Sequence, residues 1–98
     1  MFIVLITYKK QLDVIDQHLA AHRSYLDGGY QKNYLIASGP RNPRTGGVLI
    51  SQLDDRSQLE IFLQQDPFHI HDVADYEIVE FVPNKYHKNF KCFIENRL

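Results

Sequence analysis

The hydrophobic positions between residues 12 and 26 follow the spacing of one helical face, with steps of three, four and seven residues. They are Leu12, Ile15, Leu19 and Leu26. His22 falls on the same face, where a further apolar residue is due. A histidine in such a position is commonly a buried structural residue that hydrogen-bonds a carbonyl. The alternative is a site residue where the helix meets a sheet, and the spacing alone leaves both interpretations open.

Four other segments have the composition of β-strands, with β-branched and aromatic residues between turn formers. They are residues 2–8, 34–38, 47–53 and 75–82. The first is almost continuously apolar, which predicts a strand inside the sheet with both faces covered, or nearly so. Gly39-Pro40 is expected to stop the second strand, and the turn formers after it predict an exposed loop. We therefore expect the second and third strands to form an antiparallel hairpin.

Local signals also predict where the helices begin and end. Asp27-Gly28-Gly29 is expected to end the first helix near residue 26, because glycine adopts the left-handed C-cap conformation without steric cost. The run Ser57-Gln58-Leu59-Glu60 fits a capping box and predicts the start of a second helix. That helix ends by residue 65, because Pro67 disfavours helical geometry at Asp66. Asp66 is then left at a helix end, where the chain turns.

The order strand, helix, strand, strand, helix, strand predicts the α+β ferredoxin-like plait, written βαββαβ. We expect a four-stranded antiparallel sheet with both helices on one face and the first and third strands in the centre. The other face would be bare and apolar, and such a face is usually buried against a second copy, which predicts a homodimer. Residues 1–83 form the predicted domain. Residues 84–98 form a C-terminal extension, rich in large apolar residues, that is expected to pack on the sheet or on a dimer partner.

Composition narrows the classes of function. The 98 residues suffice for one core, and a formal net charge of -1 with scattered Lys and Arg lacks the electrostatic footprint of a nucleic-acid-binding protein. Cys92 is the only cysteine, so no disulfide or cysteine-based zinc site can form within one chain, which fits a reducing cytoplasm. Residues 2–7 are too short to span a bilayer. We expect neither nucleic acid nor a membrane as a partner.

Several short motifs, each common alone, occur here in a specific order and spacing. They are His22 with Tyr25-Leu26, Leu35-Ile36-Ala37-Ser38-Gly39-Pro40, Gly46-Gly47-Val48, Asp66-Pro67-Phe68 and Tyr76-Glu77-Ile78. Together they resemble the YciI-like (YCII-related) family over roughly residues 2–82. Two features depart from the family pattern. His71 and Asp72 stand where relatives often have a small residue and a glycine, and the tail beyond Pro83 is longer.

The resemblance implies a dimeric ferredoxin-like fold with a cleft in which a histidine and an aspartate form a catalytic pair. The family histidine falls on His22 and the family aspartate on Asp66, with Ser38, Gly39 and Pro40 lining the neighbourhood. Some members act in the breakdown of aromatic compounds, including a dehydrochlorinase of chlorinated hydroxyhydroquinone, and muconolactone isomerases share the fold. Lyase or isomerase chemistry is therefore the expectation, although a fold shared by many activities cannot choose among them.

A histidine paired with a carboxylate is a simple general base, because the carboxylate fixes the tautomer while the other nitrogen takes a proton. Such a pair needs no cofactor, and it suits proton abstraction next to a carbonyl in a lyase, isomerase or hydrolase-like reaction. Arg41 and Arg44 lie in the turn-rich loop, where they are either solvated or hold an anionic substrate. The predicted substrate-binding residues are Ser38, Gly39, Pro40, Arg41, Phe68 and His71.

The sequence leaves two questions about this chemistry open. His69 and His71, with the catalytic pair, would supply nitrogen and oxygen ligands for a metal, but their spacing of two is not a zinc signature, so no metal is expected. The roles of both histidines and of Asp72 stay undetermined. The chain is either a small cofactor-independent enzyme acting on a small-molecule substrate, or a non-catalytic dimer that binds a ligand or regulates through the same cleft.

Overall fold

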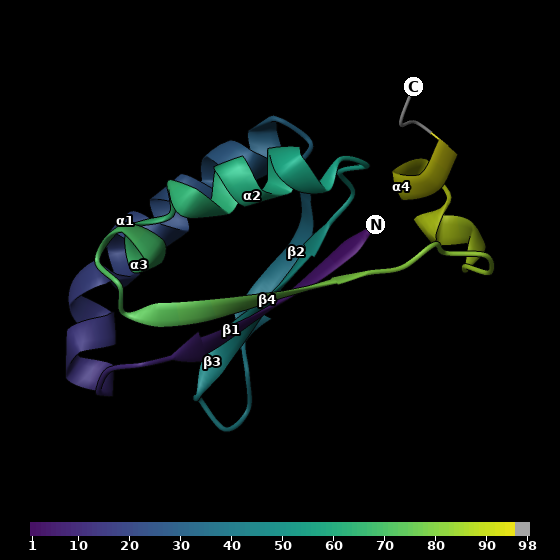
Figure 1. The fold of residues 1–98 in the computed structure, drawn as a ribbon. Coiled ribbons are helices and arrows are strands. Elements are labelled where there is room, and N and C mark those ends of the chain that lie inside the picture. Colours follow the sequence, from purple (N-terminus) through teal and green to yellow (C-terminus); the bar gives the residue numbers. More distant parts are fainter. Residues whose placement is uncertain (96–98) are drawn as a thin grey trace.

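The computed structural model describes residues 1–95 and has the predicted ferredoxin-like architecture. The strands are β1 (Phe2–Tyr8), β2 (Leu35–Pro40), β3 (Gly46–Ser51) and β4 (Ala74–Glu80), and the helices of the core are α1 (Leu12–Gln31), α2 (Arg56–Gln64) and α3 (Pro67–Ile70). The strands form one antiparallel sheet in the order β2-β3-β1-β4, so the first and third strands are central. Figure 1 shows the three helices on one face of this sheet. The prediction of an α+β plait is confirmed.

The hydrophobic core lies between the helices and one face of the sheet. On β1 the side chains of Phe2, Val4 and Ile6 are buried, whereas Ile3 and Leu5 between them are only half-buried. The strand is central, as expected, but in the single chain only the face toward the helices is fully covered. Among the fully buried side chains of the described residues, Asp66 is the only one that carries a carboxylate.

Helix α1 extends past its predicted end near residue 26 and runs to Gln31. Gly28 and Gly29 lie inside the helix, and no glycine has a positive φ. A Cβ on Gly29 would lie 2.6 Å from the ring of Phe62, so this glycine permits close packing of α1 against α2. After the helix ends, Asn33 adopts the left-handed conformation with a φ of 61°, which asparagine tolerates.

Two other boundaries differ from the sequence-based expectation. β2 continues through Gly39 to Pro40, because it is an edge strand and the missing N–H of proline removes no ladder bond there. The N-cap of α2 is Asp55, whose side chain accepts a hydrogen bond from the N–H of Ser57 at 2.9 Å. Glu60 does not close a capping box, since it accepts from Arg56 instead.

The described part of the C-terminal extension contains a short 3-10 helix (Lys88–Phe90) and α4 (Cys92–Glu95). Figure 1 shows it continuing beyond the end of β4 and turning back on itself. The rings of Phe90 and Phe93 pack with centroids 5.2 Å apart. Residues 96–98 lie outside the described part, and packing of the extension on a sheet or a partner stays a prediction. Among residues 1–95, no helix combines the length and apolar character needed to cross a bilayer.

The first prediction concerns Gly46, where β3 passes closest to β1. A Cβ there would overlap the main-chain oxygen of Ile6, which no side-chain movement can relieve. We expect Gly46→Ala to lower the free energy of unfolding by about 2 to 3 kcal/mol, which is a drop in melting temperature of roughly 10 °C or more. Gly28→Ala is the matched control, since nothing lies within 4 Å of its Cβ, and it should leave stability unchanged or slightly raised. Equal melting temperatures for the two variants would refute the steric argument.

Candidate active site

The turn between α2 and α3 places Asp66 in the interior. Gln65 caps the C-terminus of α2, and Asp66 is the N-cap of α3, with Pro67 in its first turn. The Asp66 side chain accepts a hydrogen bond from the N–H of Phe68 at 3.0 Å. An N-cap side chain of this kind turns back toward the first turn of its own helix. In this protein that turn faces the core, and Asp66 is accordingly 0% exposed.

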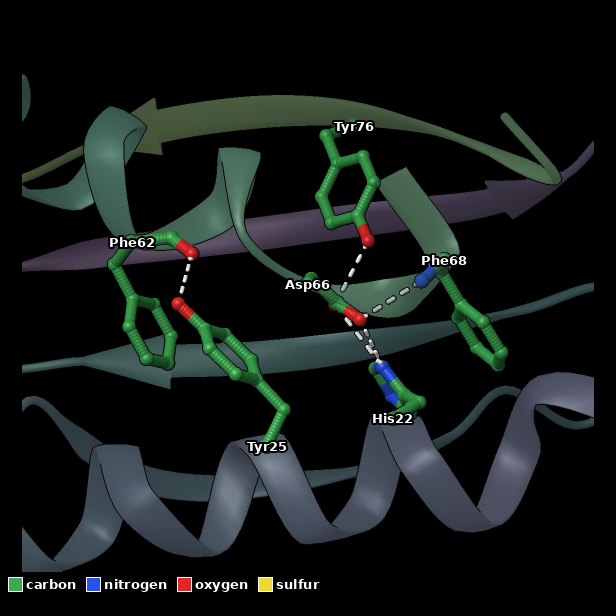
Figure 2. A network of polar contacts seen from close by, with 6 residues as sticks. All are labelled: His22, Tyr25, Phe62, Asp66, Phe68 and Tyr76. Atoms are coloured by element: carbon green, nitrogen blue, oxygen red, sulfur yellow. Dashed lines mark hydrogen bonds and ion pairs between the residues drawn. The ribbon is translucent and has the colours of Figure 1, made fainter. Parts of the chain in front are cut away.

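His22 on α1 meets this carboxylate directly. Its Nδ1 lies 2.8 Å from Oδ1 and 3.0 Å from Oδ2 of Asp66. Figure 2 shows His22 pointing from α1 toward Asp66, while Tyr76 reaches the same carboxylate from the opposite side. A carboxylate oxygen only accepts, so Nδ1 carries the proton and donates it. Nε2 is then the basic nitrogen, and it has no hydrogen-bond partner among the described residues.

Tyr76 on β4 completes the coordination of Asp66. Its hydroxyl donates to Oδ2 at 2.7 Å. Burial raises the pKa of Tyr76 far above its ordinary value, and the charge of Asp66 and the hydrogen bond to it act in the same direction. The phenol therefore stays protonated and serves as a donor at any physiological pH. Asp66 thus accepts from His22, from Tyr76 and from the N–H of Phe68, which compensates the burial of its charge.

Aromatic packing holds the imidazole in one plane. The Phe68 ring stacks on His22 with a centroid separation of 3.9 Å and an interplanar angle of 5°. Tyr8 packs its edge against Phe68 at 6.0 Å. On the same helix, Tyr25 donates its hydroxyl to the main-chain oxygen of Phe62 at 2.6 Å and so ties α1 to α2. Burial raises the pKa of Tyr25, so this hydroxyl also stays a donor.

A pocket of about 310 Å³ opens beside His22. Its walls come from α1, α3 and the strands β1, β2 and β3. The apolar part of the lining includes Ile6, Leu19, Leu26, Leu49 and Phe68. The polar part consists of Tyr8, His22, Arg23, Ser38 and Arg44. Asp66 is not in the lining, so it acts on the pocket through His22, and the arrangement suits a base whose free nitrogen meets a small molecule.

The structure brings together most of the residues that the sequence singled out. Ser38, Gly39, Pro40 and Phe68 line the pocket with His22. Within the described part of the chain, Arg41 and His71 lie outside that lining, and their assignment as binding residues stays a prediction.

The residues around His71 have other partners. The His71 ring stacks on His18 at 4.1 Å, and Asp72 pairs with Lys9 at 2.7 Å. His69 lies 5.7 Å from the ring of Tyr76. In residues 1–95 no three potential metal ligands of the His, Cys, Asp and Glu types converge, so the alternative ligand set does not assemble.

Sequence reasoning missed two polar residues of the pocket, Tyr8 and Arg23. Arg23 directly follows His22, but successive residues of a helix point about 100° apart, so the sequence alone does not place Arg23 at the pocket. Ser38 also has a partner that was not foreseen, since its hydroxyl lies 2.6 Å from that of Tyr30.

Comparisons with known proteins bear on the fold and on the family of this chain. Comparison with curated proteins gives no match. Among solved structures, one that is similar is 5-chloro-2-hydroxyhydroquinone dehydrochlorinase (TftG) from Burkholderia phenoliruptrix, in complex with 2,5-dihydroxybenzoquinone. The TM-score is 0.69 at 21% sequence identity, and the match covers 91% of this chain and 98% of the other. This likeness concerns the fold.

The family itself follows from the sequence match. A model of the YCII-related domain matches residues 1–82, which include both members of the His22–Asp66 pair and every residue that lines the pocket. The match ends at residue 82, and the domain boundary at residue 83 stays a prediction. The protein belongs to the YCII-related domain family.

Proposed function

We propose that this protein is a small cofactor-independent enzyme of the lyase or isomerase type, with His22 as its general base. The observation that carries the proposal is the 2.8 Å contact between Nδ1 of His22 and the buried carboxylate of Asp66, on a ring that lines a pocket. A carboxylate behind an imidazole selects the tautomer with a lone pair on the outer nitrogen, and it stabilises the imidazolium once a proton is taken.

The reaction begins when Nε2 of His22 removes a proton from a carbon next to a carbonyl group of the substrate. The electron pair of the broken C–H bond moves toward the carbonyl oxygen and forms an enolate. In a lyase this pair then expels a leaving group from the neighbouring carbon, and in an isomerase another carbon takes the proton back from the imidazolium. Each step moves only protons and electron pairs within the substrate and His22, so no cofactor takes part.

The family and the structural likeness support the lyase form of this chemistry. Dehydrochlorination is the loss of a proton and a chloride ion, and a base beside a pocket supplies the first half of it. The similar solved structure is a dehydrochlorinase holding a dihydroxybenzoquinone, which has a single six-membered ring. A compound of that size suits the pocket here, and we infer that small hydroxylated or oxidised aromatic rings are the first substrates to test.

The proposal includes a homodimer formed through the open face of the sheet. Strand register places six apolar side chains on that face: Ile3, Leu5, Val48, Ile50, Val79 and Phe81. Val79 and Phe81 are 41% and 38% exposed in the single chain. The same register places Glu77 opposite Leu5, so this face is largely but not wholly apolar. Such a face across adjacent strands can pair with its own copy around a two-fold axis, so a second copy is the occupant that we propose.

The dimer is tested with a charge in the middle of this face. Ile50→Glu places a carboxylate among apolar neighbours, and we expect it to convert a dimer at micromolar concentration into a monomer with an unchanged far-UV circular dichroism spectrum. Ile61→Glu on α2 is the matched control, because Ile61 is 63% exposed on the helical side of the molecule, and it should stay dimeric. Sedimentation velocity measures all three proteins. A monomeric wild type would exclude this interface.

The catalytic role of His22 is tested against His18, which lies one turn earlier on α1 and outside the pocket lining. The assay follows chloride release from 5-chloro-2-hydroxyhydroquinone, and exchange of C–H protons into deuterated water for a panel of small cyclic hydroxy and keto compounds. We expect His22→Ala to reduce the active rate by about a hundredfold to ten-thousandfold. His18→Ala should keep the wild-type rate.

Two results would contradict the catalytic proposal. One is a His22→Ala protein that melts at a lower temperature but keeps its rate per folded molecule, as a structural histidine would. The other is a panel in which compounds bind, and raise the melting temperature, without exchange or turnover. The second result would favour the non-catalytic ligand-binding or regulatory dimer.

Tyr76 serves as a positioning residue, and its hydroxyl can be removed alone. We expect Tyr76→Phe to lower the free energy of unfolding by about 1.5 to 3 kcal/mol, because a buried charged acceptor loses a donor. The kcat should fall by roughly tenfold to a hundredfold at an unchanged KM, because Asp66 then holds His22 less firmly. Tyr86→Phe in the C-terminal extension is the control. A purely structural tyrosine would reduce stability and leave the kcat of the folded protein as it was.

A further inference from the structure

The pocket beside His22 carries positive charge that the proposed base does not use. Arg23 and Arg44 both line it, whereas none of its described lining residues is Asp or Glu. Asp66, the carboxylate that contacts His22, lies behind the imidazole and is 0% exposed, and Asp16 on α1 is paired with Arg44. A small molecule entering the pocket therefore meets guanidinium groups and neutral side chains, and this favours an anion over a neutral compound or a cation.

The two arginines differ in whether their guanidinium groups already have a partner within the protein. Nη2 of Arg44 lies 2.5 Å from Oδ1 of Asp16, so the charge of Arg44 is compensated by a partner on α1. Arg23 has no ion pair and no hydrogen bond with any residue that the structure describes. Its planar donor fork is free to bind a carboxylate or a similar oxyanion through two parallel hydrogen bonds.

The rest of the pocket limits the size and character of the molecule. A cavity of about 150 Å³ lined by apolar side chains holds one benzene molecule. The pocket here has about 310 Å³, which accommodates a single six-membered ring with several substituents. Leu19, Leu26 and Phe68 supply apolar surface for such a ring.

We infer that the pocket selects a small cyclic anion, whose acidic group is bound by Arg23 while its ring lies against the apolar wall next to His22. The inference rests on the proposed function only in that the same pocket would hold the substrate of His22. It names the substrate class, a monocyclic carboxylate or a comparably acidic ring hydroxyl. It also assigns the anion-binding role to Arg23, in place of the loop arginines that the sequence suggested.

The experiment compares benzoate with benzamide, which has the same ring and nearly the same shape but no charge. Both are titrated into the full chain while amide chemical shifts of residues around the pocket are followed by NMR. We expect the wild type to bind benzoate more tightly than benzamide. Arg23→Gln should weaken benzoate binding by about tenfold, since it removes a charge-assisted hydrogen-bond pair, and should leave benzamide binding unchanged.

Three variants make the result specific. Arg23→Lys should recover only part of the affinity for benzoate, because an ammonium cannot form the two-pronged contact. Arg56→Gln is the matched control, since it removes the same charge from an exposed site on α2 that is not part of the described lining, and it should retain the wild-type affinity within about twofold. Arg41→Gln tests the loop arginine and should behave like the control.

Several outcomes would overturn the inference. They are equal affinity of the wild type for benzoate and benzamide, no shift of pocket amides with either compound, or a loss of benzoate affinity in Arg41→Gln in place of Arg23→Gln. These outcomes are separate from those that test His22. If Arg23→Gln has no effect while His22→Ala abolishes turnover, only the anion site is wrong. If Arg23→Gln loses benzoate while His22→Ala keeps the reaction rate, only the proposed base is wrong.

Discussion

The buried carboxylate of Asp66 is the constraint on which the rest of this structure depends. An ionised side chain without solvent costs several kcal/mol unless its oxygens receive hydrogen bonds, and here the donors come from three elements. His22 belongs to α1, the N–H of Phe68 to α3 and the hydroxyl of Tyr76 to β4. The three hydrogen bonds to Asp66 therefore fix the positions of α1, α3 and β4 relative to one another. The same carboxylate also orients His22, the candidate base.

The close packing of α1 against α2 limits the movement of His22 relative to Asp66. Gly29 lets α1 approach Phe62 more closely than any other residue type would allow, and Tyr25 bonds the main chain at the same place. α1 continues for 20 residues, so His22 lies in the middle of the helix and not at a fraying end. A site built from the middle of a helix and a capped turn has less freedom than one on loops, and this keeps the His22 ring in place beside the pocket.

The sequence predicts the fold class because the order of strands and helices follows from local rules, whereas the pairing of His22 with Asp66 is implied only by the resemblance to the YciI-like family. The missing apolar step at residue 22 leaves open whether His22 is a structural histidine or a site residue, and the proline after Asp66 indicates only that this aspartate lies at a helix end. The extent of α1 could not be predicted in this way, because two consecutive glycines normally end a helix and only the proximity of Phe62 explains them here. Pro40 in β2 was expected to stop the strand, although the predicted edge position of that strand allows a proline whose missing N–H faces away from β3. Which arginine faces the pocket depends on the rotation of α1 against the sheet, and spacing within one helix does not report that rotation.

The charges around His22 also bear on how the proposed base and the inferred anion site would work together in one pocket. With a neutral imidazole, the Asp66 charge behind the ring would repel an anionic ligand on the other side through a medium of low dielectric constant. An unpaired guanidinium at the pocket offsets that repulsion, and Arg23 is the lining residue that provides one. Arg23 alone would oppose formation of the imidazolium, because two like charges would then share the site. Asp66 counteracts that effect from behind the ring. Under the proposed function, the carboxylate and the guanidinium would therefore each offset the cost that the other imposes when an anionic substrate loses a proton to His22.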